Sequence, residues 1–320
     1  MDILDLRYFA SADLRPLLED EVRTWQARLH WDFRAVAEMI LRYAEMHILP
    51  GVAAIDGGRV LGYCFFLSEQ GKGGIGDVYV DTAAGDGIRE TIECDLARQA
   101  IQRLRQCSGL HRSESQLLIH PAGHLAQPFQ DGGHRRYRRL FLALPLSAWH
   151  KLEDEPPQRS VCGSEIVVQR WRKSFCEPAA EVITAAYQGH VDCDIGEQYR
   201  TLEGALGFLH NIVRYPTCGN FDASASFLAW HAASQRPAAV LLCSRLRRDV
   251  GHITQVCTLP EFRSRGIGEM LIRNCWQDLA SRGFSELSLT VTEDNRRALE
   301  LYRRLGFVAV HTFDAFVWNE

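Results

Sequence analysis

The sequence predicts an α/β (α+β) protein of two tandem domains, each formed around one sheet flanked by helices. The length of 320 residues favours two domains of roughly 150 residues each. A charged run with two prolines, EDEPPQRS at 153–160, can continue neither a helix nor a central strand. The same order of elements stands on both sides of this run. We therefore predict a domain at 1–152, a linker at 153–164 and a second domain at 165–320.

The second domain shows strands, one long helix, and then strand, helix and strand, a pattern typical of a domain built around one sheet. Apolar residues recur at helical spacing in 201–213 and again in 268–281, where Gly283 is a natural stop. Strands are predicted at 165–172, 226–233, 238–246, 252–259, 287–292 and 308–318, and helices at 176–190, 201–213, 268–281 and 296–305.

The first domain repeats this order. An opening strand precedes helices over 13–47. Strands are then predicted at 52–57, 59–68, 75–81, 115–120 and 135–146, with a helix at 88–107 between the third and the fourth of them. A repeat period of about 170 residues is far too long for a solenoid and indicates a duplicated domain.

Charge and composition exclude several classes of protein. The net charge of -4 argues against bulk attraction to nucleic acid or to an anionic membrane. No run approaches the roughly eighteen apolar residues of a membrane span, and the start of the chain is acidic where a signal peptide is basic. Ten cysteines without a C-x-x-C pair indicate reduced thiols, so we expect a cytoplasmic protein without a disulfide framework or zinc site.

Two histidines have the spacing of a possible ligand pair. His120 and His124 are four residues apart, but Pro121 and Gly123 stand between them and no further ligand follows nearby. We interpret them as a loop pair and expect no metal.

The segment 256–271 carries most of the chemical information. A strand ends there, a turn with Gly266 and Gly268 follows, and a helix begins at once. Free backbone N–H groups then point to one place at the positive end of the helix dipole, which suits a pyrophosphate. Arg263 and Arg265 add complementary charge. The segment lacks the third glycine and the place in the first βα turn that a Rossmann site needs, and it lacks the G-K-[ST] of a Walker loop. Both of these nucleotide sites are therefore excluded.

Two motifs resemble those of the GNAT acyltransferases. The run Arg-Ser-Arg-Gly-Ile-Gly at 263–268 resembles the R/Q-x-x-G-x-G/A signature of that superfamily, and Pro260 stands where the family often has a proline. The run at 295–307 resembles the second motif, N-x-x-A-x-x-L/F-Y-x-x-x-G-F. The resemblance covers about half the chain and implies two tandem GNAT-like domains with mixed, mostly antiparallel sheets.

The resemblance also implies roles for individual residues. The loop amides would hold the pyrophosphate of acetyl-CoA, the end of the preceding strand would pair with the pantetheine arm, and the amide of Val256 would polarise the thioester carbonyl. Asn295 would bind the pantetheine, and Tyr302 would protonate the leaving thiolate. The residues so assigned to the cofactor are Val256, Cys257, Thr258, Arg263, Ser264, Arg265, Gly266, Ile267, Gly268, Asn295 and Tyr302. Without the motif, Tyr302 would be a core aromatic residue and Asn295 a helix cap.

The attacking amine needs a base. His252 aligns with the catalytic glutamate of histone-type members and is the first candidate, although it is equally well explained as a structural strand histidine. Glu293 and a water chain are the alternatives. The acidic and aromatic segment 187–200 corresponds to the part of the family that selects the acceptor, and it suits a cationic or polar amine, or is simply a polar loop.

The first domain has the order of a GNAT domain without its chemistry. Thr82 stands where the signature has Arg or Gln, and the loop to Gly87 is shortened. In the second motif Ala122 replaces the asparagine and Phe129 the tyrosine. A phenylalanine cannot protonate a thiolate, so we interpret this half as a degenerate copy that helps to shape the acceptor site.

The sequence therefore predicts an N-acetyltransferase that moves acetyl from acetyl-CoA to a primary amine, favouring a small molecule, by direct attack on the thioester. Protein amines and longer acyl groups stay open, as does the oligomeric state. The alternative is a non-catalytic acyl-CoA sensor or interaction protein on the same tandem fold.

Overall fold

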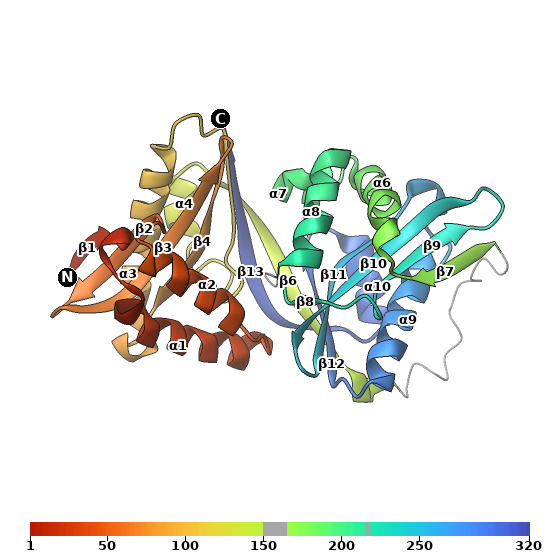
Figure 1. Cartoon of the computed structure of the whole chain (residues 1–320), viewed down its shortest axis with the longest axis horizontal. Helices are drawn as coiled ribbons and strands as arrows, with labels where there is room; N and C mark the ends of the chain where they lie inside the picture. The colour runs from red at the N-terminus through yellow and green to blue at the C-terminus, as the bar shows by residue number, and fades with distance from the viewer. Residues whose placement is uncertain (150–164, 216–217) are drawn as a thin grey trace. The chain divides into compact units, whose positions relative to one another are not determined.

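The computed structural model describes residues 1–149, 165–215 and 218–320 (Figure 1). The predicted linker, 153–164, lies outside the described residues. The chain divides into two compact units, one of Met1–Arg139 with His311–Glu320 and one of Leu140–Val310. No helix among the described residues is long and apolar enough to cross a membrane.

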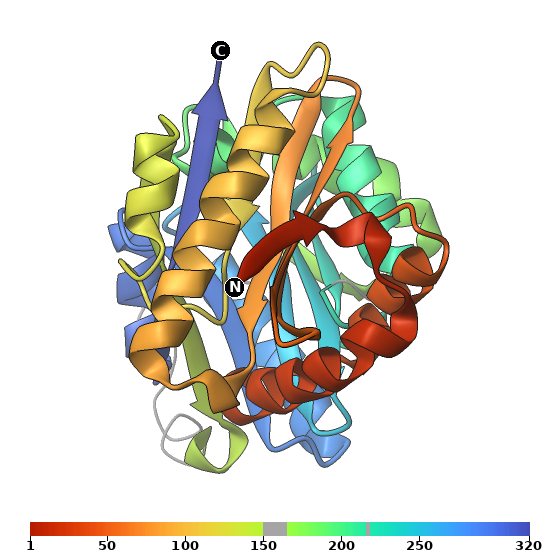
Figure 2. The same ribbon diagram turned by 90° about the vertical axis from the view of Figure 1, so that its left-hand side faces the viewer.

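The first unit is a sheet with the strand order β1-β2-β3-β4-β5-β13. The long helix α3 lies across β2, β3 and β4, where its apolar face packs into the core of this unit (Figure 2). Its strands are β1 (Asp2–Asp5), β2 (Gly51–Asp56), β3 (Arg59–Glu69), β4 (Lys72–Val80) and β5 (Arg112–Gln116), with β13 (Val308–Asn319) added, and its helices are α1 (Ser11–Leu29), α2 (Arg34–Glu45), α3 (Asp86–Arg105) and α4 (Ala126–Asp131).

The second unit has the strand order β6-β12-β11-β10-β9-β7, with β8 on β10. Helices α6 and α9 both pack against β10 and β11, on opposite faces of the sheet (Figure 1). Its strands are β6 (Arg135–Pro145), β7 (Ile166–Arg170), β8 (Asn220–Phe221), β9 (Phe227–His231), β10 (Arg236–Arg247), β11 (Val250–Thr258) and β12 (Glu286–Thr292), and its helices are α6 (Cys176–Tyr187), α7 (Asp192–Ile195), α8 (Leu202–Arg214), α9 (Ile267–Ser281) and α10 (Arg296–Arg304).

The ends of the two units differ from the predicted domain ranges in two segments of the chain. Residues from Leu140 on count with the second unit, where the apolar side chains of Leu142 and Leu144 join its core. Residues from His311 on count with the first unit, where Phe316 is buried in the core. The alternation of apolar residues predicts both strands, but it does not say which core each strand enters.

Both sheets are mixed, as predicted, and each contains a parallel pair that opens towards its carboxyl end. Strands β11 and β12 pair from Val250 and Glu286 only as far as Ile253 and Leu289, although both strands continue beyond that point. In the first unit, β4 and β5 pair only at Lys72–Gly73 with Arg112–Ser113. Beyond the last paired residues, the two strands of each parallel pair no longer pair with each other as neighbours in the sheet.

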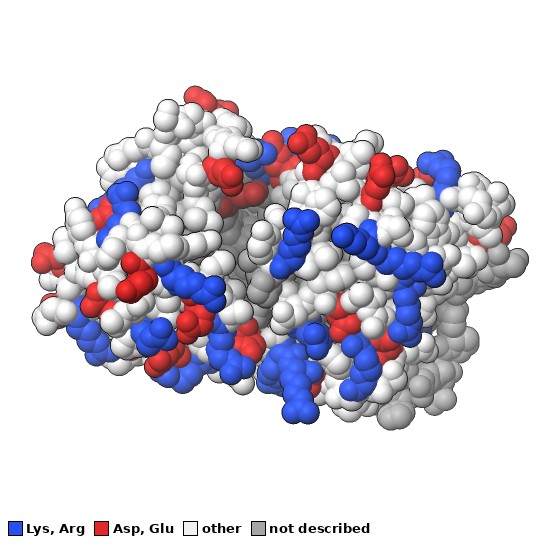
Figure 3. Space-filling view, in the orientation of Figure 1, with Lys and Arg blue, Asp and Glu red and all other residues white. Residues whose placement is uncertain are grey.

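Most of the predicted elements are present, and one strand of the first unit is shorter than predicted. The predicted strand at 115–120 ends at Gln116, because the chain turns and the His120 N–H bonds the Leu117 carbonyl. The helical region at 13–47 is two helices. On the face of the molecule in Figure 3, acidic and basic side chains are interspersed, which fits the net charge of -4.

Candidate active site

A cavity of about 780 Å³ lies in the second unit, where β11 parts from β12. Four segments line it: the end of β11, the loop into α9, the start and inner face of α10, and residues between the end of α6 and α7. All of the residues assigned to the cofactor from sequence line this cavity except Arg265. Segments from Ala186 to Arg304 are thereby brought to one site.

The strand end supplies an open backbone edge. Val256, Cys257 and Thr258 pair with β10 but no longer with β12, and all three line the cavity. A bulge in β11 at Thr254 accompanies the parting of the strands, since the register against β10 shifts there. An extended ligand arm could therefore lie along this edge as an added strand would.

The loop into α9 has the backbone conformation of an anion site. Ser264 and Gly266 both have positive φ, 64° and 81°. The first bond from an amide of α9 back to the loop runs from Met270 N to Gly266 O, so the preceding amides have no partner within the helix. These amides and the dipole of a fifteen-residue helix favour a bound anion.

The arginines of this loop do not share one role. The Arg263 guanidinium bonds the Ala186 carbonyl at 2.6 Å and the Thr258 carbonyl at 3.3 Å, and so ties the loop to α6 and β11. Arg265 lies over the Phe262 ring, 5.4 Å from its centre. The basic residues on α10 were not singled out from sequence, yet Arg296, Arg297 and Arg304 all line the cavity. Arg297 also bonds Ser264 Oγ at 2.9 Å.

The second motif places its two polar residues on the cavity wall. Asn295 Oδ1 accepts the Ala298 N–H at 3.2 Å, so this residue caps α10 and also lines the cavity. Tyr302 is 7% exposed, and burial raises the pKa of its phenol well above the usual range, with smaller contributions from Asp192 and Cys257. The phenol is therefore protonated at neutral pH and can donate a proton.

An acidic residue that the sequence did not single out lies near the phenol. Asp192, at the start of α7, accepts a hydrogen bond from Thr292 Oγ1, at the end of β12. Its charge contributes to the raised pKa of both Tyr302 and Tyr187, whose main cause is burial. The Tyr187 ring stacks on Tyr199 at 4.6 Å. The segment 187–200 was expected to meet the acceptor, but only the fold distinguishes Asp192 from the other acids in it.

The two candidate bases lie elsewhere. His252 is 4% exposed, its Nδ1 is 2.9 Å from Ser288 Oγ, and its ring stacks on Phe141. It does not line the cavity, and neither does Glu293, which is exposed. The strand histidine is thus held by the sheet through Ser288.

The corresponding loop of the first unit is occupied by the protein itself. The Thr82 N–H and Oγ1 both bond Asp20 Oδ2, at 3.1 and 2.9 Å. Asp81 Oδ1 accepts the Ala83 N–H at 2.8 Å. Carboxylates therefore bond the amides of Thr82 and Ala83, and their charge opposes a bound anion at this loop.

We expect one molecule of coenzyme A to bind per chain, in the second unit. The amides that directly precede Met270 have no partner within the helix, whereas the amides of Thr82 and Ala83 in the first unit are bonded to carboxylates. Calorimetric titration of the whole chain measures the stoichiometry. Two equivalent sites per chain would contradict this expectation.

Comparison with known proteins gives a consistent family. The model of the Acetyltransferase (GNAT) family matches residues 196–307. An uncharacterized N-acetyltransferase of Methanocaldococcus jannaschii is 39% identical over 19% of this chain and 27% of its own length. A mycothiol acetyltransferase of Gordonia bronchialis is 35% identical over 27% of this chain and 29% of its own. The chain thus spans less than a third of the length of these curated relatives.

Two solved structures match almost the whole chain. A GCN5-related N-acetyltransferase from Sphaerobacter thermophilus has a TM-score of 0.65 at 20% identity, covering 99% of this chain and 95% of its own. A tandem GNAT protein from the clavulanic acid biosynthesis pathway has a TM-score of 0.61 at 15% identity, covering 99% and 98%. At these identities the likeness establishes the tandem fold.

Proposed function

The chain belongs to the GNAT superfamily, with two GNAT-like units in tandem, and on that premise we propose that its second unit transfers acetyl from acetyl-CoA to a primary amine of a small molecule. The amine attacks the thioester directly. One observation carries the proposal: the loop, the strand edge and Tyr302, which two separate motifs pointed to, line the same cavity.

Binding of the cofactor would use backbone more than side chains. The pyrophosphate would accept the amides that precede Met270, with Arg297 beside them. The pantetheine arm would lie along Val256–Thr258, where the parallel partner has parted. The thioester would then come to lie near Tyr302 at the inner end of the cavity, with the amide of Val256 as the proposed donor to its carbonyl oxygen.

The reaction exchanges one bond for another. The amine nitrogen bonds to the carbonyl carbon and the carbon–sulfur bond breaks. The nitrogen gives its proton to a base, the thiolate receives a proton from Tyr302, and the Tyr302 phenolate regains one from solvent. A buried, protonated phenol supports that role. Burial raises the pKa of Cys257 to about 12, so this cavity-lining thiol is protonated and a poor nucleophile. Its state favours direct attack over an acyl-cysteine intermediate.

We propose Asp192, in place of His252, as the group that receives the acceptor. A carboxylate attracts an ammonium ion and can take its proton once the amine is positioned. The Thr292 hydroxyl donates to Oδ1, and the backbone N–H of Asp192 donates to His190 Nδ1, so the residue is held at its carboxylate and at its backbone. Asp192 directly follows Val191, which lines the cavity, whereas the buried His252 is bonded to Ser288 inside the sheet.

Replacing this carboxylate tests the acceptor side separately from the cofactor side. We expect Asp192→Asn to lower kcat/KM for the amine about tenfold or more, since a hydrogen bond to a charged group contributes about 1.5–3 kcal/mol. Coenzyme A affinity should stay the same. Asp194→Asn is the matched control, because Asp194 is on the same short helix and pairs with Arg200. Equal kinetics of the two variants would remove Asp192 from the site.

The proposed activity is tested by thiol release from acetyl-CoA with a panel of amino sugars, polyamines, amino acids and lysine peptides. We expect release above the rate of hydrolysis with at least one small amine. Preference for the peptides would instead assign a protein acceptor. Tight coenzyme A binding without release on any amine would support the acyl-CoA sensor.

A further inference from the structure

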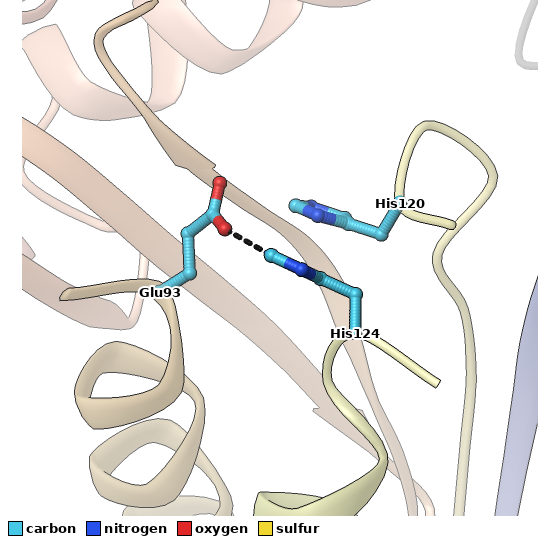
Figure 4. A group of neighbouring side chains, drawn as sticks. All are labelled: Glu93, His120 and His124. Carbon is cyan, nitrogen blue, oxygen red and sulfur yellow. Dashed lines mark hydrogen bonds and ion pairs between the residues drawn. The ribbon is translucent and has the colours of Figure 1, made fainter. Parts of the chain in front are cut away.

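Three metal-ligating side chains converge inside the first unit, away from the proposed active site (Figure 4). They are Glu93 on α3, and His120 and His124 on the segment between β5 and α4. Each offers a ligand atom, and these atoms all lie within 4.8 Å of one another. The sequence was interpreted as having no further ligand near the two histidines, because the third comes from a helix that precedes them in the chain.

The cluster is rigid and largely removed from water. The Glu93 side chain is 5% exposed and that of His124 19%, and His120 is 6% exposed. Glu93 Oε2 is in direct contact with His124 Nε2, and the two imidazole rings stack 5.5 Å apart at 10°. Little conformational freedom would therefore be lost when a ligand bound.

The two remaining polar contacts of the cluster match the outer shell of a metal site. His120 Nε2 bonds the Val78 carbonyl at 2.7 Å. A metal-bound histidine characteristically donates its second ring N–H to a carbonyl or a carboxylate, which fixes the tautomer and the ring. On the other side of the carboxylate, Arg89 Nε lies 3.8 Å from Glu93 Oε1, while Arg89 also pairs with Asp86. Oε2 therefore faces the histidines.

We propose that Glu93, His120 and His124 bind one divalent transition metal ion, and that the donor chemistry favours Zn²⁺. Two imidazoles and a carboxylate are a common zinc donor set, and imidazole disfavours Mg²⁺ and Ca²⁺, which take oxygen ligands. Zinc bonds of about 2.0–2.2 Å would replace the present contact between Glu93 and His124. Three protein ligands leave one position for water or another small ligand.

The position of the site gives it a consequence within the first unit. Val78 lies on β4 beyond the point at which β4 pairs with β5, so His120 bonds a carbonyl on the strand edge that the parting exposes. A metal at this place would join α3, this edge and the segment before α4. A structural ion would thus lie beside the exposed strand edge of the first unit. In the second unit, we propose that the corresponding edge binds the cofactor.

Zinc titration of the whole chain, after chelator treatment and against a chromophoric competitor, tests the proposal. We expect one high-affinity Zn²⁺ per chain. Glu93→Gln and His124→Ala should each weaken binding at least about 100-fold, more than the roughly 10- to 100-fold typical of losing an outer-shell partner. His111→Ala, an exposed histidine of the same unit, is the control and should bind as the wild type does.

Two further measurements separate a lost ligand from a lost fold. Zn²⁺ should raise the melting temperature of the wild type and of His111→Ala but not of Glu93→Gln, whose side chain keeps its size. Co²⁺ should give the visible absorption of a four-coordinate site in the wild type and in His111→Ala, but not in Glu93→Gln. Absence of a high-affinity ion, or binding that Glu93→Gln and His124→Ala leave unchanged, would overturn the proposal.

Discussion

Tyr302→Phe is expected to lower kcat about 100-fold while coenzyme A affinity changes little. The substitution removes the hydroxyl and leaves the ring, which is buried in the cavity wall and packs edge-on against Phe307 at 5.8 Å. General acid catalysis contributes about 100- to 10,000-fold, and a thiolate leaves tolerably well without a proton, so the lower end applies. An interaction made only in the transition state lowers kcat and kcat/KM together.

The measurement is steady-state thiol release with the best acceptor, beside direct titration of coenzyme A. Tyr215→Phe is the matched control, since Tyr215 is exposed in the same unit. A Tyr302→Phe enzyme with wild-type turnover, or one whose whole defect is in cofactor affinity, would show that the phenol is not the acid.

Gly266→Val is expected to weaken coenzyme A binding about 100-fold or more in a folded protein. Gly266 has a φ of 81°, which a β-branched residue adopts only at a cost of about 1–2 kcal/mol, and relaxation would turn the loop amides away from the pyrophosphate. Each charged hydrogen bond lost contributes about 1.5–3 kcal/mol, so the loss of one or two suffices for this effect.

Gly283→Val provides the control for backbone strain. Gly283 follows the other end of α9, has a φ of 79°, and has open space where a β-carbon would lie. Both variants should lose similar stability in chemical denaturation, while only Gly266→Val loses cofactor affinity. Equal affinities in the two folded variants would show that the loop does not hold the pyrophosphate.

Local patterns were enough to predict most elements and the turn into α9. The alternating strands and the helical stripes depend on the period of the backbone, which neighbouring residues reveal. The loop at 263–268 and the cap at Asn295 depend on contacts within a few residues, such as the bond from Ala298 N to Asn295 Oδ1. Such features are encoded locally, so they can be predicted before the fold is known.

The side-chain roles were harder to predict, because they depend on contacts with residues that are distant in the sequence. Arg263 was expected to add charge that complements a phosphate, and its bonds to the carbonyls of Ala186 and Thr258 could not be foreseen from the loop sequence. His252 was placed by alignment on a candidate base, yet a serine on β12 holds it inside the sheet. In the sequence Asp192 is one of several acids in its segment, and only its hydrogen bond with Thr292 and its charge interaction with Tyr302 in the fold distinguish it.

The sequence by itself determined the two-unit α/β plan, the turn into α9 at 263–268, the cap at Asn295 and the altered second motif of the first unit. Only the tertiary structure decided which core receives the strand ends after Leu140 and His311, and that Glu93 meets His120 and His124. The physical reason is the range of the interactions. Backbone periodicity and capping act over a few residues, whereas burial and side-chain pairing join segments whose separation along the chain leaves no local pattern.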